Sequence, residues 1–191
     1  MPNPRRVRPR IPVKVAVAAA RRIRHPWYRC PSLAIAATEI NDPKLRLALV
    51  DEAFAAADQL EEPNRVVTVA SWPIEILAER GPSERLQIEV RRLLALAASE
   101  PHGLRRANAQ SWLLHRVWPD VGGRQQVLDA FLATCAVAFG WRRDRMLMLL
   151  APRLATVDSA RAAEVVAMIE RASYRRRSQR DVDAALAGAS G

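Results

Sequence analysis

The chain has 191 residues, half of them hydrophobic, and a formal net charge of +10. This length suits one domain, and so much apolar material supports a continuous core, which excludes wholesale disorder. Alanine and leucine dominate, glycine is scarce and alternating valine-rich runs are missing. Composition therefore predicts an all-α fold.

The positive charge is concentrated at the N-terminus. Residues 1–36 hold nine basic side chains and no acid, whereas the remainder holds 21 basic and 20 acidic residues. Four prolines predict an extended arm over residues 1–12. Such an arm is typical of contact with phosphates, an acidic protein or anionic lipid, and it also fits a solvated tail or a transit peptide. The candidate anion or nucleic-acid contacts are Arg5, Arg6, Arg8, Arg10, Lys14, Arg21, Arg22 and Arg24.

In chain order, apolar spacing and turn residues predict a basic helix near 12–24, four helix pairs and a weak helix near 179–187. The predicted pairs are 28–40 with 44–60, 64–79 with 84–99, 104–117 with 124–138, and 142–155 with 159–172. Asp42, Ser83 and Ser159 are predicted N-caps. Pro73 and Pro152 fall inside predicted helices, and we expect each to kink or interrupt its helix.

The pairs align on four arginines, Arg29, Arg65, Arg105 and Arg143, which are 36, 40 and 38 residues apart. Positions four, seven and eight residues later are mostly apolar and share one helical face. The same alignment places Arg177 at a fifth position. This periodicity predicts two-helix repeats. We expect the arginines to bind helix-end carbonyls or neighbouring carboxylates, and a line of positive charge along one edge is the alternative.

Two segments resemble bacterial HEAT-like repeats: residues 49–57, followed by Pro63-Asn64-Arg65, and residues 141–154. The resemblance covers roughly residues 27–172. It implies a right-handed α-solenoid of about four antiparallel helix pairs, HEAT/armadillo-like, with an N-terminal arm and capping helix over 1–26 and a basic tail over 173–191. The third unit fits least well, because Ala109 and Arg116 replace larger apolar residues.

The sequence offers no arrangement of residues suited to catalysis or metal binding. His25, His102 and His115 are widely separated, and there is no phosphate-binding glycine loop, HExxH helix or CxxC pair. Cys30 and Cys135 stand alone, which indicates a reducing, cytoplasmic setting, and we expect Cys135 to be a core residue. No apolar run is long enough for a membrane span. We therefore expect no enzyme activity, no cofactor and no integral membrane segment.

Solenoids bind partners along an extended concave face. We therefore expect a non-enzymatic protein–protein interaction scaffold that uses the second helix of each pair to bind an unknown protein partner. The candidate concave-face contacts are Arg46, Arg85, Gln87, Arg92, Arg124 and Gln125. The alternative is a nucleic-acid-binding HEAT-like protein that uses the basic arm and a basic groove. The five tryptophans fit either core packing or a groove lining.

Overall fold

The computed structural model describes residues 12–189, and within this range the chain forms ten helices and no strand. Helix lengths run from nine to 18 residues. The helices are α1 (Val13–Arg22), α2 (Pro26–Thr38), α3 (Pro43–Ala57), α4 (Pro63–Arg80), α5 (Ser83–Ala98), α6 (Gly103–Val117), α7 (Val121–Val137), α8 (Trp141–Ala155), α9 (Ser159–Ala167) and α10 (Ala172–Ala189).

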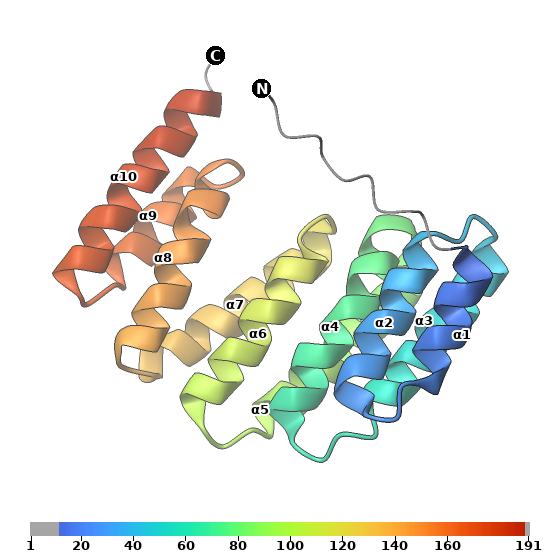
Figure 1. Ribbon diagram of the computed structural model, residues 1–191. Helices are drawn as coiled ribbons and strands as arrows, with labels where there is room; N and C mark the ends of the chain where they lie inside the picture. The colour runs from blue at the N-terminus through green and yellow to red at the C-terminus, as the bar shows by residue number, and fades with distance from the viewer. Residues whose placement is uncertain (1–11, 190–191) are drawn as a thin grey trace, which may run out of the picture.

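The helices lie in two rows, as Figure 1 shows. Helices α2, α4, α6, α8 and α10 form the first row, and α3, α5, α7 and α9 form the second. Each predicted pair packs together, α2 on α3, α4 on α5, α6 on α7 and α8 on α9. Helix α1 covers α2, and α10 covers α8 at the other end. An all-α fold in which each helix packs on its neighbours is thus confirmed.

Two of the three predicted N-caps are wrong by one residue. Asp42 does cap α3, and its carboxylate accepts a hydrogen bond from the backbone N–H of Lys44 at 2.8 Å. Ser83 and Ser159 are instead the first helical residues of α5 and α9. Before α9 the cap is Asp158, which accepts from the N–H of Arg161 at 2.9 Å. A carboxylate there also offsets the positive end of the helix dipole, which favours it over the serine.

Of the two outcomes expected for the internal prolines, a kink or an interruption, the interruption is not found. Helix α4 runs continuously through Pro73 and α8 runs through Pro152. Pro73 is buried, with Ile74 beside it in the core. A proline removes one helical hydrogen bond, but the packing of the apolar face supplies most of a helix's stability in a folded protein. Both α4 and α8 therefore continue through the proline although one hydrogen bond is missing.

The largest boundary difference lies at the C-terminal end, where α9 stops at Ala167 rather than 172 and α10 begins at Ala172 rather than near 179. Two residues of α8 hold the intervening turn. Arg143 donates to the carbonyl oxygen of Met168 and pairs with Glu170 at 2.5 Å. Asp144 accepts from the backbone N–H of Arg171 at 2.7 Å. These long-range bonds fix a turn that local sequence does not indicate.

Polar side chains connect each helix of the second row to the next. The carboxylates of Asp51, in the middle of α3, and of Asp58, at its C-terminal cap, pair with Arg85 and Arg92 of α5 at 3.1 and 2.8 Å. The buried Glu89 forms ion pairs with both of these arginines and accepts a hydrogen bond from Arg92. Further along, Arg161 of α9 pairs with Asp129 of α7 at 2.7 Å. At the start, Arg21 of α1 binds Glu52 with two bonds of 2.8 and 2.6 Å.

Candidate functional site

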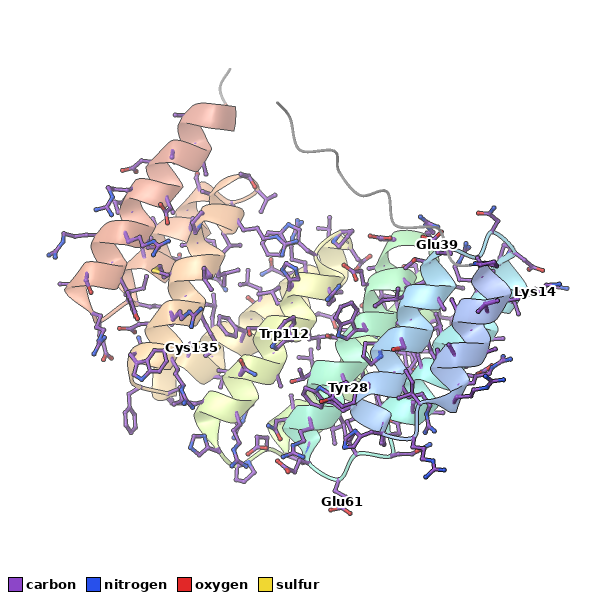
Figure 2. All side chains as sticks on the ribbon, in the orientation of Figure 1. Lys14, Tyr28, Glu39, Glu61, Trp112 and Cys135 are labelled. Carbon is purple, nitrogen blue, oxygen red and sulfur yellow. The ribbon has the colours of Figure 1, made fainter. Side chains whose placement is uncertain are left out.

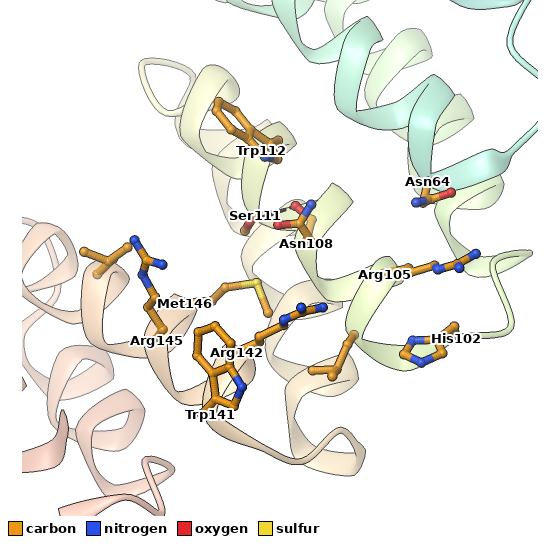
Figure 3. A pocket seen from close by; sticks show the side chains of 12 residues that line it. Asn64, His102, Arg105, Asn108, Ser111, Trp112, Trp141, Arg142, Arg145 and Met146 are labelled. Carbon is orange, nitrogen blue, oxygen red and sulfur yellow. Dashed lines mark hydrogen bonds between the residues drawn. The ribbon is translucent and has the colours of Figure 1, made fainter. Parts of the chain in front are cut away.

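A groove separates α6 from α8 in the first row. These two helices contact each other far less extensively than α6 contacts α4. Two hollows of about 720 and 290 Å³ lie along the interface, and they form one groove because they share four lining residues, Ser111, Trp112, Met146 and Leu149. Figure 3 shows α6 supplying one wall and the start of α8 supplying the other.

Two of the groove's tryptophans occupy repeat positions that are covered elsewhere. Trp112 aligns with Trp72 of the preceding pair, yet Trp72 is half-buried against the core while Trp112 is 41% exposed. Trp141 aligns with Trp27, which is again half-buried, but Trp141 is 46% exposed. The position of Trp112 on the first row is visible in Figure 2. The separation of α8 from α6 therefore leaves two large aromatic rings uncovered on opposite walls.

Cationic groups gather at the end of the groove where α6 and α8 begin. Arg105 comes from α6, and Arg142 and Arg145 come from α8. Arg105 lies 3.8 Å from the carboxylate of Glu62, while the guanidinium of Arg142 lies 5.4 Å from the ring centre of Trp141. Neither α6 nor α8 has a side-chain hydrogen bond capping its N-terminus. A carboxylate does lie near each helix start, Glu100 at 3.0 Å from the N–H of His102 and Asp144 in the first turn of α8, so the arginine side chains are the source of the positive charge here.

No aspartate or glutamate is among the described residues that line either hollow. The other polar groups of the larger hollow are neutral side chains from α4 and α6, namely Asn64, Asn108 and Ser111, together with His102. Since the second-row arginines are matched by carboxylates, the groove differs from the second-row surface in its net charge. Its chemistry suits an anionic ligand that also has a planar apolar part.

At its other end the groove narrows around Trp118, His115 and Arg153. The guanidinium of Arg153 lies 4.1 Å from the ring centre of Trp118 and 2.6 Å from Nδ1 of His115. A guanidinium can only donate, so Nδ1 must accept, which requires that this nitrogen carry no proton. Burial, together with the charges of Arg153 and Arg116, lowers the pKa of His115. Burial also lowers the pKa of Arg153, as does the nearby Arg124.

The residues predicted as concave-face contacts are bound within the chain. Arg85 and Arg92 form the ion pairs of the second row, and Gln87 donates to the carboxylate of Asp120 at 3.0 Å. Gln125 donates to the carboxylate of Asp129, one turn further along α7, at 3.1 Å. These side chains cross-link or stabilise the second-row helices. A partner would have to compete with those bonds to use them.

Arg46 and Arg124 share a different local role with Arg106. Each is the fourth residue of its helix, and each donates to the carbonyl oxygen six residues earlier, just before the turn: Arg46 to Ile40, Arg106 to Glu100 and Arg124 to Trp118, at 3.0–3.2 Å. The bond satisfies a carbonyl at the end of the preceding helix. This spacing is a sequence feature that could have identified these arginines as turn residues.

Of the N-terminal candidates, Arg5, Arg6, Arg8 and Arg10 lie outside the described residues. Lys14, Arg22 and Arg24 are exposed on or just after α1. Arg21 is exposed but paired, and its hydrogen bonds with Glu52 raise its pKa. Among the described residues, the candidate Arg21 therefore forms an ion pair with a carboxylate, whereas Lys14, Arg22 and Arg24 do not.

The aligned arginines do not share one role. Arg29 donates to the side chain of Gln59, Arg65 pairs with Glu62 at 3.1 Å, and Arg177 pairs with Asp181 at 3.7 Å. Arg143 is buried and bonds a helix-end carbonyl. Arg105 lines the groove. The expected pairing with carboxylates or helix ends is found for Arg65, Arg105, Arg143 and Arg177, and Arg105 also lines the groove.

Both cysteines are buried, which confirms the prediction that Cys135 is a core residue. Burial raises the pKa of Cys135 to about 12 and raises that of Cys30 as well. Because the thiolate is the reactive form, we expect Ellman's reagent to label the native protein at least about 10³-fold more slowly than the urea-unfolded protein. Cys30→Ala and Cys135→Ala would assign each rate, and rapid labelling of the native chain would contradict the burial.

Metal ions and membranes give no alternative site within the described residues. Between residues 12 and 189, no group of three or more histidine, cysteine, aspartate or glutamate side chains is arranged to hold a metal ion. No helix in the same range combines the length and apolar character needed to cross a bilayer. Comparisons of the chain with family models, with curated proteins and with solved structures found no match. The groove is therefore interpreted from its own chemistry.

Proposed function

We propose that this protein is a non-enzymatic binding module that holds an anionic partner in the α6–α8 groove. The observation that carries the proposal is the composition of the groove. Arginines and exposed tryptophans line it, and no carboxylate lies among its described lining residues. A concave surface with one sign of charge concentrates counter-ions of the opposite sign and speeds their association.

The architecture supports a binding role. We assign the helix pairs to a right-handed, HEAT-like solenoid, and the packing of each pair on the next supports this assignment. Stacked repeats present long surfaces rather than one deep catalytic pocket. An experimentally determined structure would test the handedness directly.

The second-row surface, which the sequence favours for protein binding, is the weaker candidate. Arg85 and Arg92 are matched by carboxylates of α3, and Gln87 is engaged with the N-cap of α7. Removing a paired arginine from such a surface costs an intrachain bond as well as any contact with a partner. The groove arginines Arg142 and Arg145 are exposed, and the described residues form no ion pair with them. We therefore place the binding site in the first row.

Heparin tests this proposal, because it is a polyanion that has no planar base. In the full chain, the double substitution Arg142→Gln with Arg145→Gln is expected to weaken heparin binding by about tenfold or more, since a charge-assisted hydrogen bond contributes roughly 1.5–3 kcal/mol. The measurement is the dissociation constant in low salt by isothermal titration.

The matched control is Arg175→Gln with Arg176→Gln on α10, which removes the same charge from exposed positions outside the groove. The N-terminal arm is present in every variant, so its contribution cancels in the comparison. Equal losses of heparin affinity in the two double variants would show that only net charge matters and would refute the groove as the site.

A further inference from the structure

We infer that the anionic partner of the α6–α8 groove is single-stranded nucleic acid. The exposed tryptophans stack on bases, and the arginines at the wide end contact phosphates. The inference rests on the proposed function, which requires only that the partner be anionic. The stacking residues are Trp112 and Trp141, and the phosphate contacts are Arg105, Arg142 and Arg145.

The aromatic walls are the first argument. Trp112 and Trp141 stand on different helices and both retain over 40% exposure. Contiguous exposed apolar surface in a groove is typical of ligand binding, and tryptophan is enriched at binding hot spots. Every base has a flat face that stacks on an aromatic ring, and such stacking changes affinity by roughly 5- to 150-fold per base.

The spacing of charge relative to the rings is the second argument. Trp141 and Arg145 are four residues apart on α8, and Arg142 and Arg145 are three apart, so the three side chains share one face of the helix. Arg105 and Trp112 are seven residues apart on α6 and share a face in the same way. A base stacked on either ring therefore has its phosphates beside a planar guanidinium, which binds phosphate oxygens in pairs.

The dimensions of the groove favour a single strand over a duplex or a free nucleotide. The wide hollow of about 720 Å³ is the size of a small-molecule site and admits a base or two, whereas paired bases inside a duplex cannot reach its walls. The groove also continues past Trp112 toward Trp118 and Arg153. A strand can follow this path, while a mononucleotide would leave it empty.

An acidic peptide would satisfy the arginines but not the pair of aromatic walls. Carboxylate side chains carry no planar ring, so their binding would depend little on the tryptophans. Dependence on Trp112 and Trp141 is therefore the property that separates nucleic acid from other polyanions.

The test uses the full chain, low salt, and fluorescence anisotropy with a short labelled oligo(dT) and the same strand in abasic form. Trp112→Leu and Trp141→Leu are each expected to weaken oligo(dT) binding by roughly 5- to 150-fold, and to leave binding of the abasic strand nearly unchanged. Trp112→Phe, which keeps an aromatic face, is expected to retain most of the affinity. Tyr28→Leu on α2, an exposed aromatic residue away from the groove, is the matched control.

Four results would overturn the inference: unchanged oligo(dT) binding by both tryptophan variants, equal losses for the abasic strand, tighter binding of a duplex or of poly-glutamate than of oligo(dT), or thymidine monophosphate binding as tightly as the oligomer. The heparin experiment distinguishes failure of the proposed function from failure of the nucleic-acid assignment. If the arginine variants lose heparin affinity while the tryptophan variants keep oligo(dT) affinity, the anionic site stands and only the nucleic-acid assignment fails.

Discussion

Replacing Arg143 by alanine is expected to lower the free energy of unfolding by about 3–5 kcal/mol. The side chain is almost fully buried, with 5% exposure, at the start of α8. It bonds the carbonyl oxygen of Met168 and the carboxylate of Glu170, and it lies 3.7 Å from the buried carboxylate of Asp144. Its removal leaves Asp144 with the backbone N–H of Arg171 as a donor and takes away the arginine that pairs with it among the described residues.

The control for this prediction is Arg145→Ala, two residues further along the same helix. Arg145 is exposed, so its loss is expected to change stability by no more than about 0.5 kcal/mol. Urea unfolding followed by circular dichroism measures both variants. A loss of stability in Arg143→Ala no greater than in Arg145→Ala would mean that the arginine does not hold the turn before α10. Loss of Arg143 is thus expected to lower stability, whereas Arg145 is expected to contribute to heparin binding and little to stability.

The second large effect is expected for Phe131→Ala, which should destabilise the protein by about 3–5 kcal/mol. Phe131 is 1% exposed on α7, and its side chain forms part of the floor beneath the narrow end of the groove. Truncation to alanine removes apolar contacts and opens a cavity that the surrounding helices cannot fully close. For a chain of this size the melting temperature should fall by roughly 6–20 °C.

Phe139→Ala is the matched control, because Phe139 follows α7 by two residues and is 78% exposed. Its truncation is expected to shift the melting temperature by at most a degree or two, in keeping with a surface substitution. Differential scanning calorimetry compares the two alanine variants. Similar melting temperatures for both would contradict the packing described for α7.

The helix pairs could be predicted because each helix has local features that define it. The buried residues Leu33, Val69, Ala109 and Leu147 stand four residues after the aligned arginines, and that spacing alone indicates which face is covered. Prolines and the Asp42 cap indicate where helices begin. Ala109, whose small size made the third unit doubtful, is fully buried, and Arg116 stacks on the ring of Trp72 at 3.7 Å. The irregular residues of that unit are therefore accommodated by packing against α4.

The groove could not be predicted, because helical spacing tells which side chains face a neighbour and not how near the neighbour lies. Trp72 and Trp112 occupy equivalent positions, and the sequence cannot show that only the second is left uncovered. The turn before α10 escaped prediction for a similar reason, since the bonds from Arg143 and Asp144 span 25–27 residues. The engagement of Arg85 and Arg92 likewise depends on carboxylates some 34 residues away.

The ion pairs between α3 and α5 limit whether one helix pair of the chain could stand in the place of another. Asp51 and Asp58 are seven residues apart, and so are their partners Arg85 and Arg92, so two turns of one helix match two turns of the next. Further along the row, α5 contacts α7 through the amide of Gln87, and α9 contacts α7 through a single arginine–aspartate pair, Arg161 with Asp129. Each two neighbouring helices of the second row are therefore held together by their own set of partner residues. A unit duplicated or transplanted within the chain would meet unmatched charges, so this array is an ordered assembly of non-interchangeable parts.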